Sequence, residues 1–334
     1  MNKNITLLSL YASSSRYDFF ILKDELQKND SGCSVHYFLG NREAKEKNQV
    51  RSMLYEAGAL KDYDSDWVGI EGFLPEEFVI EGSKTKRYLL LEPFDILFRM
   101  KWNRKNCQQF LQGYTHVVVP SSYWADKIRS CMGESEIQIL RDVQLPFFEK
   151  AADQTYQQVS RAQLEERYTD LIGKKIMYIN LTGQRANPER NDYTEMNMKA
   201  LLDILPEDWI IVTNSLNLRF ASRYLDAVYR NKFIYLSAGT MKQQLLTCAD
   251  CLMSNNAYSC ALFASMGRPY AIVQFSDNSF EKYMHKRSRH QMITNKENMA
   301  ETVRLMINGE YPSRMVEELD MTADKSLVQE ILDI

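Results

Sequence analysis

Small polar residues with hydroxyl or amide side chains follow four apolar runs in the second half of the chain. These stretches span residues 182–185, 213–215, 237–240 and 254–259. In an open parallel sheet, ligands bind outside the carboxyl ends of the strands, where loops meet helix N-termini. Plain connecting loops are polar too, but they usually carry more Lys, Glu and Asp than these stretches do. The pattern therefore predicts a ligand-binding edge.

The segment AYSCALFASMG at 257–267 is predicted to be a helix, and its first turn carries Tyr258 and Ser259. The first turn of a helix presents unpaired N–H groups and a partial positive charge, so a phosphate binds there without a dedicated cation. The same side chains also suit simple helix capping, and that alternative stays open. The predicted donor-binding residues of this edge are Thr182, Arg185, Asn214, Ser215, Asn255, Asn256, Tyr258 and Ser259.

A diphosphate needs more positive charge than one helix supplies, and the run KRSRH offers it. We predict that Arg287 and Arg289 of this run, with Arg185, form a guanidinium clamp on a pyrophosphate. A solvated basic face is the alternative. His285 precedes the run and His290 ends it, and with Arg185 they are the candidate catalytic residues, because an imidazole exchanges protons near neutral pH.

Ser13, Ser14 and Arg16 follow the first predicted strand and are predicted to lie on the acceptor side of the same cleft. They would also suit a cap of the next helix.

Two motifs could indicate a metal or redox site. Cys248 and Cys251 form a C-x-x-C motif, but no second pair and no nearby His accompany them, so two buried thiols are the favoured interpretation. Asp64 and Asp66 form a D-x-D pair with no strand before it, which favours a solvated acidic loop. We therefore predict no metal and no cofactor.

Short apolar runs alternate with amphipathic segments in both halves of the chain, which is typical of parallel sheets covered on two faces. Strands are predicted at 5–11, 34–39, 87–93, 115–120, 138–140, 174–181, 208–214, 232–237, 250–254 and 269–275. Helices are predicted at 16–27, 121–133, 194–205, 219–230, 241–249 and 257–267. The predicted fold class is α/β, with two Rossmann-type, doubly wound parallel-sheet domains facing each other across a cleft.

The length of 334 residues and the hydrophobic content of 45% suit two domains of ordinary size. We predict an N-terminal acceptor-side domain at 1–155, a C-terminal nucleotide-donor domain at 156–310, and a C-terminal helix at 311–334 that packs back toward the first domain. The net charge of −3 gives no global basic field, so no nucleic-acid partner is predicted. The oligomeric state is left open.

The apolar runs are too short for a signal peptide or a membrane span, so any membrane contact is expected to be peripheral, at the inner face. Six cysteines scattered along the chain fit a reducing compartment. A cytoplasmic location is therefore predicted.

An ordered series of segments over residues 110–285 resembles the CDP-glycerol glycerophosphotransferase family. The series comprises GYTHVVVPSSYWADKIRSCMG, QLPFFEKA, KKIMYINLTGQR and FIYLSAGTMKQQLLTCADCLMSNNAYSCALFASMGRP. Arg185 matches a family arginine, and Asp250 and Pro269 have the family's separation. The chain departs from the family where Asn255 and the next three residues replace Asp-Tyr-Ser-Ser, and where Asn214 and Ser215 replace a histidine.

The resemblance implies a GT-B fold and a metal-independent transferase. Such an enzyme moves a glycerophosphate-type group from a nucleotide-activated donor, CDP-glycerol or CDP-ribitol, to a teichoic-acid-like, polysaccharide or lipid-linked acceptor. One alternative keeps the fold and uses a nucleotide sugar in capsule or O-antigen synthesis. Another, motivated by the missing family histidines, is a catalytically degenerate binding partner in a polymer-assembly complex.

Overall fold

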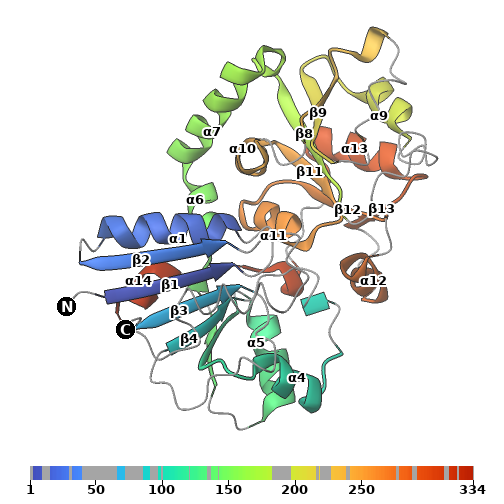
Figure 1. Ribbon diagram of the computed structural model, residues 1–334. Helices are drawn as coiled ribbons and strands as arrows, with labels where there is room; N and C mark the ends of the chain where they lie inside the picture. The colour runs from blue at the N-terminus through green and yellow to red at the C-terminus, as the bar shows by residue number, and fades with distance from the viewer. Residues whose placement is uncertain are drawn as a thin grey trace. The chain divides into compact units, whose positions relative to one another are not determined.

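The computed structural model contains two compact units, each built on its own parallel sheet (Figure 1). It describes residues 3–9, 16–29, 32–39, 66–71, 86–90, 97–98, 101–119, 121–133, 137–141, 143–182, 197–215, 218, 227–237, 241–275, 278–287, 292–311, 316–321 and 323–333. Unit 1 comprises residues 1–92, 100–149 and 320–334, and unit 2 comprises residues 93–99 and 150–319. The domain boundaries expected from the sequence stay predictions.

Unit 1 is built on a six-stranded sheet with the order β2-β1-β3-β4-β5-β6, in which every pair is parallel. Its strands are β1 (Lys3–Ser9), β2 (Cys33–Leu39), β3 (Trp67–Glu71), β4 (Lys86–Leu90), β5 (His116–Val119) and β6 (Gln138–Arg141). Its helices are α1 (Arg16–Asn29), α4 (Arg104–Leu111), α5 (Ser122–Met132) and α14 (Leu327–Leu332), and α6 (Pro146–Ala152) lies at the boundary with unit 2. A short parallel pair joins β7 (Val143–Gln144) to β14 (Lys325–Ser326).

Helix α5 shows how the sequence sets the local structure of unit 1. Trp124, Ile128 and Met132 recur at every fourth position and are buried, so one stripe of the helix packs inward. The helix ends at Gly133, whose φ of +66° is strained for a residue with a Cβ. This ending agrees with the helix predicted at 121–133.

Unit 2 is built on a second six-stranded parallel sheet, with the order β10-β9-β8-β11-β12-β13. Its strands are β8 (Lys175–Asn180), β9 (Trp209–Thr213), β10 (Phe233–Tyr235), β11 (Cys251–Ser254), β12 (Tyr270–Val273) and β13 (Ile293–Thr294). Its helices are α7 (Gln154–Arg167), α9 (Met198–Ile204), α10 (Lys242–Cys248), α11 (Ala257–Ser265), α12 (Ser279–Lys286) and α13 (Met299–Ile307), with 3-10 turns η2 (Thr169–Leu171), η5 (Ala227–Tyr229) and η7 (Glu317–Leu319).

The central strands β9, β8, β11 and β12 of unit 2 are buried on both faces, as the continuous apolar runs predicted. Met177 and Ile179 of β8 belong to a core shared with α9 and α13. Tyr178, between them, is fully buried on the opposite face, and helix α11 has eight buried residues out of nine. Helices therefore cover the sheet on two sides, and Figure 1 shows α13 and α10 beside its strands.

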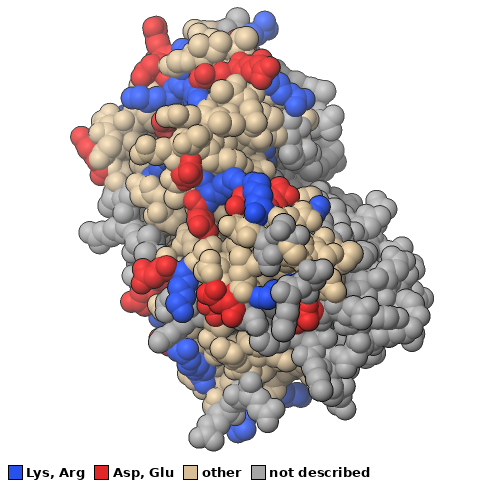
Figure 2. Space-filling model, turned by 90° about the vertical axis from the view of Figure 1, so that its left-hand side faces the viewer, with Lys and Arg blue, Asp and Glu red and all other residues tan. Residues whose placement is uncertain are grey.

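Charges of both signs are interspersed on the face of the molecule drawn in Figure 2. No helix among the described residues is long and apolar enough to cross a membrane. The strand predictions that fall on described residues, and the helices predicted at 16–27, 121–133, 194–205, 241–249 and 257–267, are confirmed, with ends that shift by a few residues. The segment predicted as a C-terminal helix at 311–334 contains η7, β14 and α14, so that, among its described residues, only the last part is α-helical. Most of the helix predicted at 219–230 lies outside the described residues, and its last part forms η5.

Candidate functional site

The strand order of unit 2 reverses between β8 and β11. The chain runs from β8 outward to β9 and β10, and then returns to the other side of β8 at β11. Asn180, the last residue of β8, is paired in register with Ser254, the last residue of β11. Open parallel sheets bind their ligands at the carboxyl ends of the strands at such a reversal. We define the switch-point edge as residues 180–182, 213–215 and 254–259.

The turn after β11 is tied to the segment after β8 by one amide side chain. Asn255 Oδ1 accepts a hydrogen bond from the Thr182 backbone N–H at 2.7 Å, and Asn255 Nδ2 donates to the Thr182 carbonyl at 2.8 Å. Ser254 Oγ donates to the Asn180 carbonyl at 2.6 Å. Asn255 and Ser254 are fully buried, whereas Thr182 is half-buried. These hydrogen bonds hold the segment after β8 and the turn after β11 side by side.

Helix α11 begins inside the same network. Asn256 is its N-cap, and its Oδ1 accepts from the Ser259 N–H at 3.0 Å and from the Ser259 hydroxyl at 2.9 Å. The Ser259 hydroxyl also accepts from Asn180 Nδ2 at 2.7 Å. Ser259 and Tyr258 are fully buried, while Asn256 is half-buried. The N-cap of α11 is therefore Asn256, and not Tyr258 or Ser259 as the alternative from the sequence had it. The Ser259 hydroxyl bonds two amide side chains of the edge.

Asn214, after β9, carries a buried donor that has no partner in the part of the chain that the structure describes. Its Oδ1 accepts from the Tyr178 hydroxyl at 2.8 Å, but its Nδ2 is buried and has no hydrogen-bond partner among the described residues. The side chain is only 7% exposed. Tyr178 and Asn180 are two residues apart on β8 and so point to one face of the sheet, the face that α11 covers. An orphaned donor thus lies on the face where the α11 first turn lies.

Ser215 ties the end of β9 to the end of β8. Its hydroxyl accepts from the Leu181 N–H at 2.7 Å and donates to the Ile179 carbonyl at 3.3 Å. Thr213 donates to the same Ile179 carbonyl at 2.7 Å and accepts from the Ser215 N–H at 3.1 Å. The three strand ends β9, β8 and β11 are therefore cross-linked by side chains.

Glu281 is a member of this network that the sequence analysis missed. It is 4% exposed, and its carboxylate accepts from Asn255 Nδ2 at 2.9 Å and from the Phe275 N–H at 3.1 Å. Asn278 caps α12 by accepting from the Glu281 N–H at 2.9 Å, and it donates to the Asn255 carbonyl at 2.8 Å. The signal in the sequence is the capping-box spacing N-x-x-E at 278–281, which precedes an amphipathic segment.

The remaining predicted site residues lie elsewhere or outside the described residues. His285 is exposed on the last turn of α12. Arg287 ends α12, where its Nε lies 4.0 Å from the buried Glu318 carboxylate and its guanidinium stacks on Tyr283 at 5.7 Å from the ring centre. Arg16 is the first residue of α1 in unit 1. The predicted residues outside the described ones are Ser13, Ser14, Arg185, Arg289 and His290.

Cys248 and Cys251 of the C-x-x-C motif, and Asp66 of the D-x-D pair, have contacts that suit a role in the fold. Burial raises the pKa of the Cys248 thiol to about 12 and raises the pKa of Cys251 as well, so both stay protonated at neutral pH. Asp66 accepts from the Asn4 N–H at 2.9 Å and so joins the start of β3 to β1. Within the described ranges, no group of three or more His, Cys, Asp or Glu residues could hold a metal ion.

Comparisons with known proteins place this chain by its fold. No family model and no curated protein sequence matches it. A variant of the wall teichoic acid polymerase TagF superposes with a TM-score of 0.68 and 15% identity, covering 100% of this chain and 88% of that one. A TagF variant soaked with CDPG gives 0.60 and 12%, covering 100% and 87%. The UDP-GlcNAc 2-epimerase from Neisseria meningitidis, bound to UDP-GlcNAc, gives 0.64 and 10%, covering 99% and 98%.

The shared architecture is the GT-B-type fold, and the predicted α/β class with two parallel sheets is confirmed. The cleft between the two domains stays a prediction. The resemblance predicted from the sequence is confirmed at the level of the fold: this chain has the fold of the wall teichoic acid polymerase TagF along its whole length.

Proposed function

We propose that the switch-point edge of unit 2 binds the diphosphate of a nucleotide-activated donor, and that the chain is a transferase of cell-wall glycopolymer synthesis. The favoured donor is CDP-glycerol or CDP-ribitol, and the favoured acceptor is a polysaccharide or a teichoic-acid-like, lipid-linked chain. The proposed enzyme needs no metal.

The observation that carries the proposal is that Asn214 Nδ2 is buried and is bonded by none of the described residues. A buried N–H group without an acceptor costs about 1–3 kcal/mol, and natural folds rarely keep one without a use. A phosphate or carbonyl oxygen of a ligand would accept this hydrogen bond and offset the cost. Because Asn214 Nδ2 lies on the sheet face that carries the first turn of α11, one bound anion could accept hydrogen bonds from Nδ2 and from the backbone N–H groups of that turn.

The kind of anion is inferred from the fold. TagF has been studied with CDPG, and the epimerase binds UDP-GlcNAc, so two structures of this fold are linked to nucleotide compounds. Fold alone does not fix a reaction, and the transferase assignment therefore also uses the segment series described above. The carboxamide of Asn214 occupies the place where that series implies a histidine, so this position would donate a hydrogen bond and would not exchange a proton.

The other predicted residues take their places in this proposal. Thr182, Ser215, Asn255, Asn256, Tyr258 and Ser259 shape the edge. Arg185 and Arg289 would supply positive charge, and Arg287 would do so on exchanging its contact with Glu318 for a phosphate. His285 and His290, with Arg185, are the groups to test for catalysis. Ser13, Ser14 and Arg16 would face the acceptor in the N-terminal domain (1–155), with the donor in the C-terminal domain (156–310). The proposed location is cytoplasmic and peripheral to the membrane.

A calorimetric titration with CDP and UDP tests the binding step. The expected result is saturable binding of at least one nucleotide to the intact chain, and at least tenfold weaker binding to Asn214→Asp, because a carboxylate repels phosphate. Asn231→Asp is the matched control, since it makes the same charge change on the exposed turn before β10. Absence of binding to the unmodified protein, or equal loss in both variants, would overturn the proposal.

A transfer assay then separates the chemistries. Turnover of CDP-glycerol or CDP-ribitol, and not of UDP-sugars, is the expected result. Turnover of a UDP-sugar would favour the second candidate, a nucleotide-sugar transferase, which the similarity to the UDP-GlcNAc enzyme supports. Nucleotide binding without turnover of any donor would favour the degenerate binding partner.

A further inference from the structure

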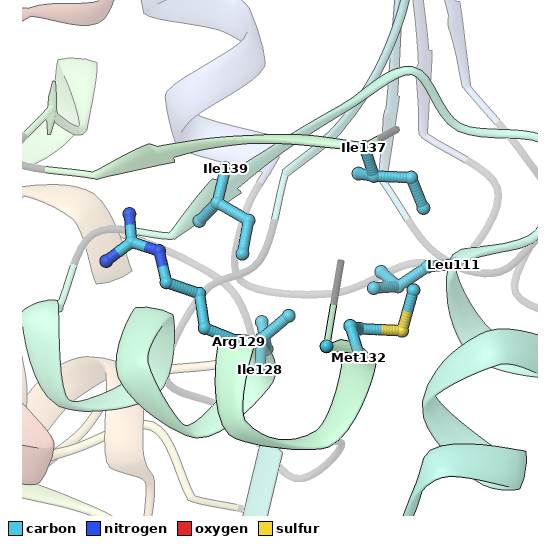
Figure 3. A pocket seen from close by; sticks show the side chains of 7 residues that line it. Leu111, Ile128, Arg129, Met132, Ile137 and Ile139 are labelled. Carbon is cyan, nitrogen blue, oxygen red and sulfur yellow. The ribbon is translucent and has the colours of Figure 1, made fainter. Parts of the chain in front are cut away.

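Unit 1 contains an apolar cavity of about 270 Å³ between α4, α5 and β6. Figure 3 shows Ile137 and Ile139 on one side of it and Ile128 and Met132 of α5 on the other, with Leu111 of α4 closing one end. Ile128 and Leu111 are buried, whereas Ile137 and Ile139 are half-buried. The hydrocarbon wall therefore continues to the protein surface, where it would contact water if nothing covered it.

One cation lies at this cavity. Arg129 is part of its lining, and Figure 3 shows the guanidinium at the end opposite Leu111, on the side of Ile139. Its side chain is 43% exposed and bonds Asp126, 70% exposed, at 3.2 Å. An exposed ion pair of this kind contributes only about 0–1 kcal/mol, so a stronger anion can replace the carboxylate. The cavity thus combines an apolar interior with a positive rim.

Helix α5 also carries a cluster of aromatic and cationic side chains outside the lining of the cavity. Lys127 of α5 lies within 5.8 Å of the ring centres of Trp102, Tyr123 and Trp124. Trp102 and Tyr123 are half-buried, and amphipathic rings of this kind, with neighbouring cations, are favoured at the boundary between lipid and water. Three further exposed cations lie in or just before α4, at Lys101, Arg104 and Lys105.

We propose that this cavity binds one hydrocarbon chain of an anionic membrane lipid, with the lipid phosphate at Arg129. The apolar lining accounts for the chain, and the guanidinium, which binds phosphate oxygens in a bidentate manner, accounts for the head group. The proposal concerns unit 1 alone and does not depend on nucleotide binding by unit 2.

Binding of n-decyl phosphate, measured by calorimetry below its micelle concentration, tests the proposal. Each methylene that leaves the cavity should weaken binding about fourfold, so n-octyl phosphate should bind roughly fifteenfold more weakly. Arg129→Gln should weaken decyl phosphate binding about tenfold and leave binding of n-decanol unchanged. Arg104→Gln removes the same charge from α4 away from the cavity, and it is expected to bind like the unmodified protein.

Filling the cavity is the second arm. Ile139→Phe should abolish decyl phosphate binding, and Ile137→Trp, at the half-buried mouth, serves if the first variant does not fold by circular dichroism. The protein should also bind phosphatidylglycerol vesicles more tightly than phosphatidylcholine vesicles, and Arg129→Gln should reduce the difference. The proposal is overturned if decyl phosphate does not bind, or if the affinity for alkyl phosphates does not depend on chain length. It is also overturned if a folded cavity-filling variant binds decyl phosphate as well as the unmodified protein does, or if Arg129→Gln leaves the preference for phosphatidylglycerol vesicles unchanged.

Discussion

Replacing Tyr178 and Asn214 together, by Phe and Leu, is expected to leave unit 2 as stable as before or more stable, and to abolish nucleotide binding. The Tyr178 hydroxyl donates to Asn214 Oδ1 at 2.8 Å, and Asn214 Nδ2 has no partner among the described residues. The double variant removes the orphaned donor together with the hydrogen bond beside it. Neither the Tyr178 hydroxyl nor the Asn214 amide then remains buried in unit 2.

The magnitude follows from these two contributions. The orphaned N–H costs about 1–3 kcal/mol, and the hydrogen bond contributes about 1 kcal/mol net. Removing both should therefore raise the free energy of unfolding by about 0–2 kcal/mol. Asn214→Leu alone should be less stable than the double variant, since it leaves the Tyr178 hydroxyl buried without an acceptor.

Thr213→Val is the matched control, because it removes a buried hydroxyl next to Asn214 whose bonds are complete. Thr213 donates to the Ile179 carbonyl and accepts from the Ser215 N–H, so its loss should destabilise unit 2 by about 1–3 kcal/mol. Urea denaturation, with hydrogen exchange of the β8 and β9 peptides to assign the transition to unit 2, measures both variants. A double variant that is destabilised as much as Thr213→Val would refute the view that Asn214 keeps an unsatisfied donor for a ligand.

Two further substitutions test the hydrogen-bond network and the Cys248 thiol. Glu281→Ala should lower the stability of unit 2 by about 2–4 kcal/mol, because Asn255 Nδ2 and the Phe275 N–H lose this acceptor, and Glu281→Gln should recover part of the loss in thermal unfolding. Burial raises the pKa of Cys248 from 9.0 to about 12, so its contribution to stability is complete below pH 9 and is lost as the pH rises toward 12. Cys248→Ala should flatten this alkaline decline by up to about 1.4 kcal/mol per pH unit, and an unchanged decline would contradict the assignment.

The positions of the strands in unit 2 could be predicted because each is a short apolar run bounded by polar residues. A strand that is buried on both faces must be apolar along its buried length, as the four central residues IMYI of β8 are, and this pattern does not depend on its neighbours. The alternation of strands and helices predicts that the strand order reverses somewhere in the sheet, because doubly wound sheets generally do so, but it does not identify β8 as that place. The polar residues after β8, β9 and β11 could therefore be grouped as one edge before their contacts were known.

The contacts themselves could not be predicted. Glu281 lies 26 residues from Asn255, and the capping-box spacing at 278–281 marks the start of a helix but does not indicate that this carboxylate is bonded to Asn255. The sequence gives no sign that, among the described residues, the oxygen of the Asn214 amide is bonded and its nitrogen is not, since this depends on where Tyr178 lies in space. Helix α4 was missed because its residues are mostly polar, with Cys107 and Leu111 its buried apolar members, and the cavity beside it was missed with it.

A crystal structure of the chain soaked with CDP would show whether Asn214 binds the donor. The diphosphate is expected to occupy the switch-point edge, with one of its oxygens within about 3.2 Å of Asn214 Nδ2. A nucleotide bound at any other place, with the Asn214 amide still lacking an acceptor, would contradict this expectation.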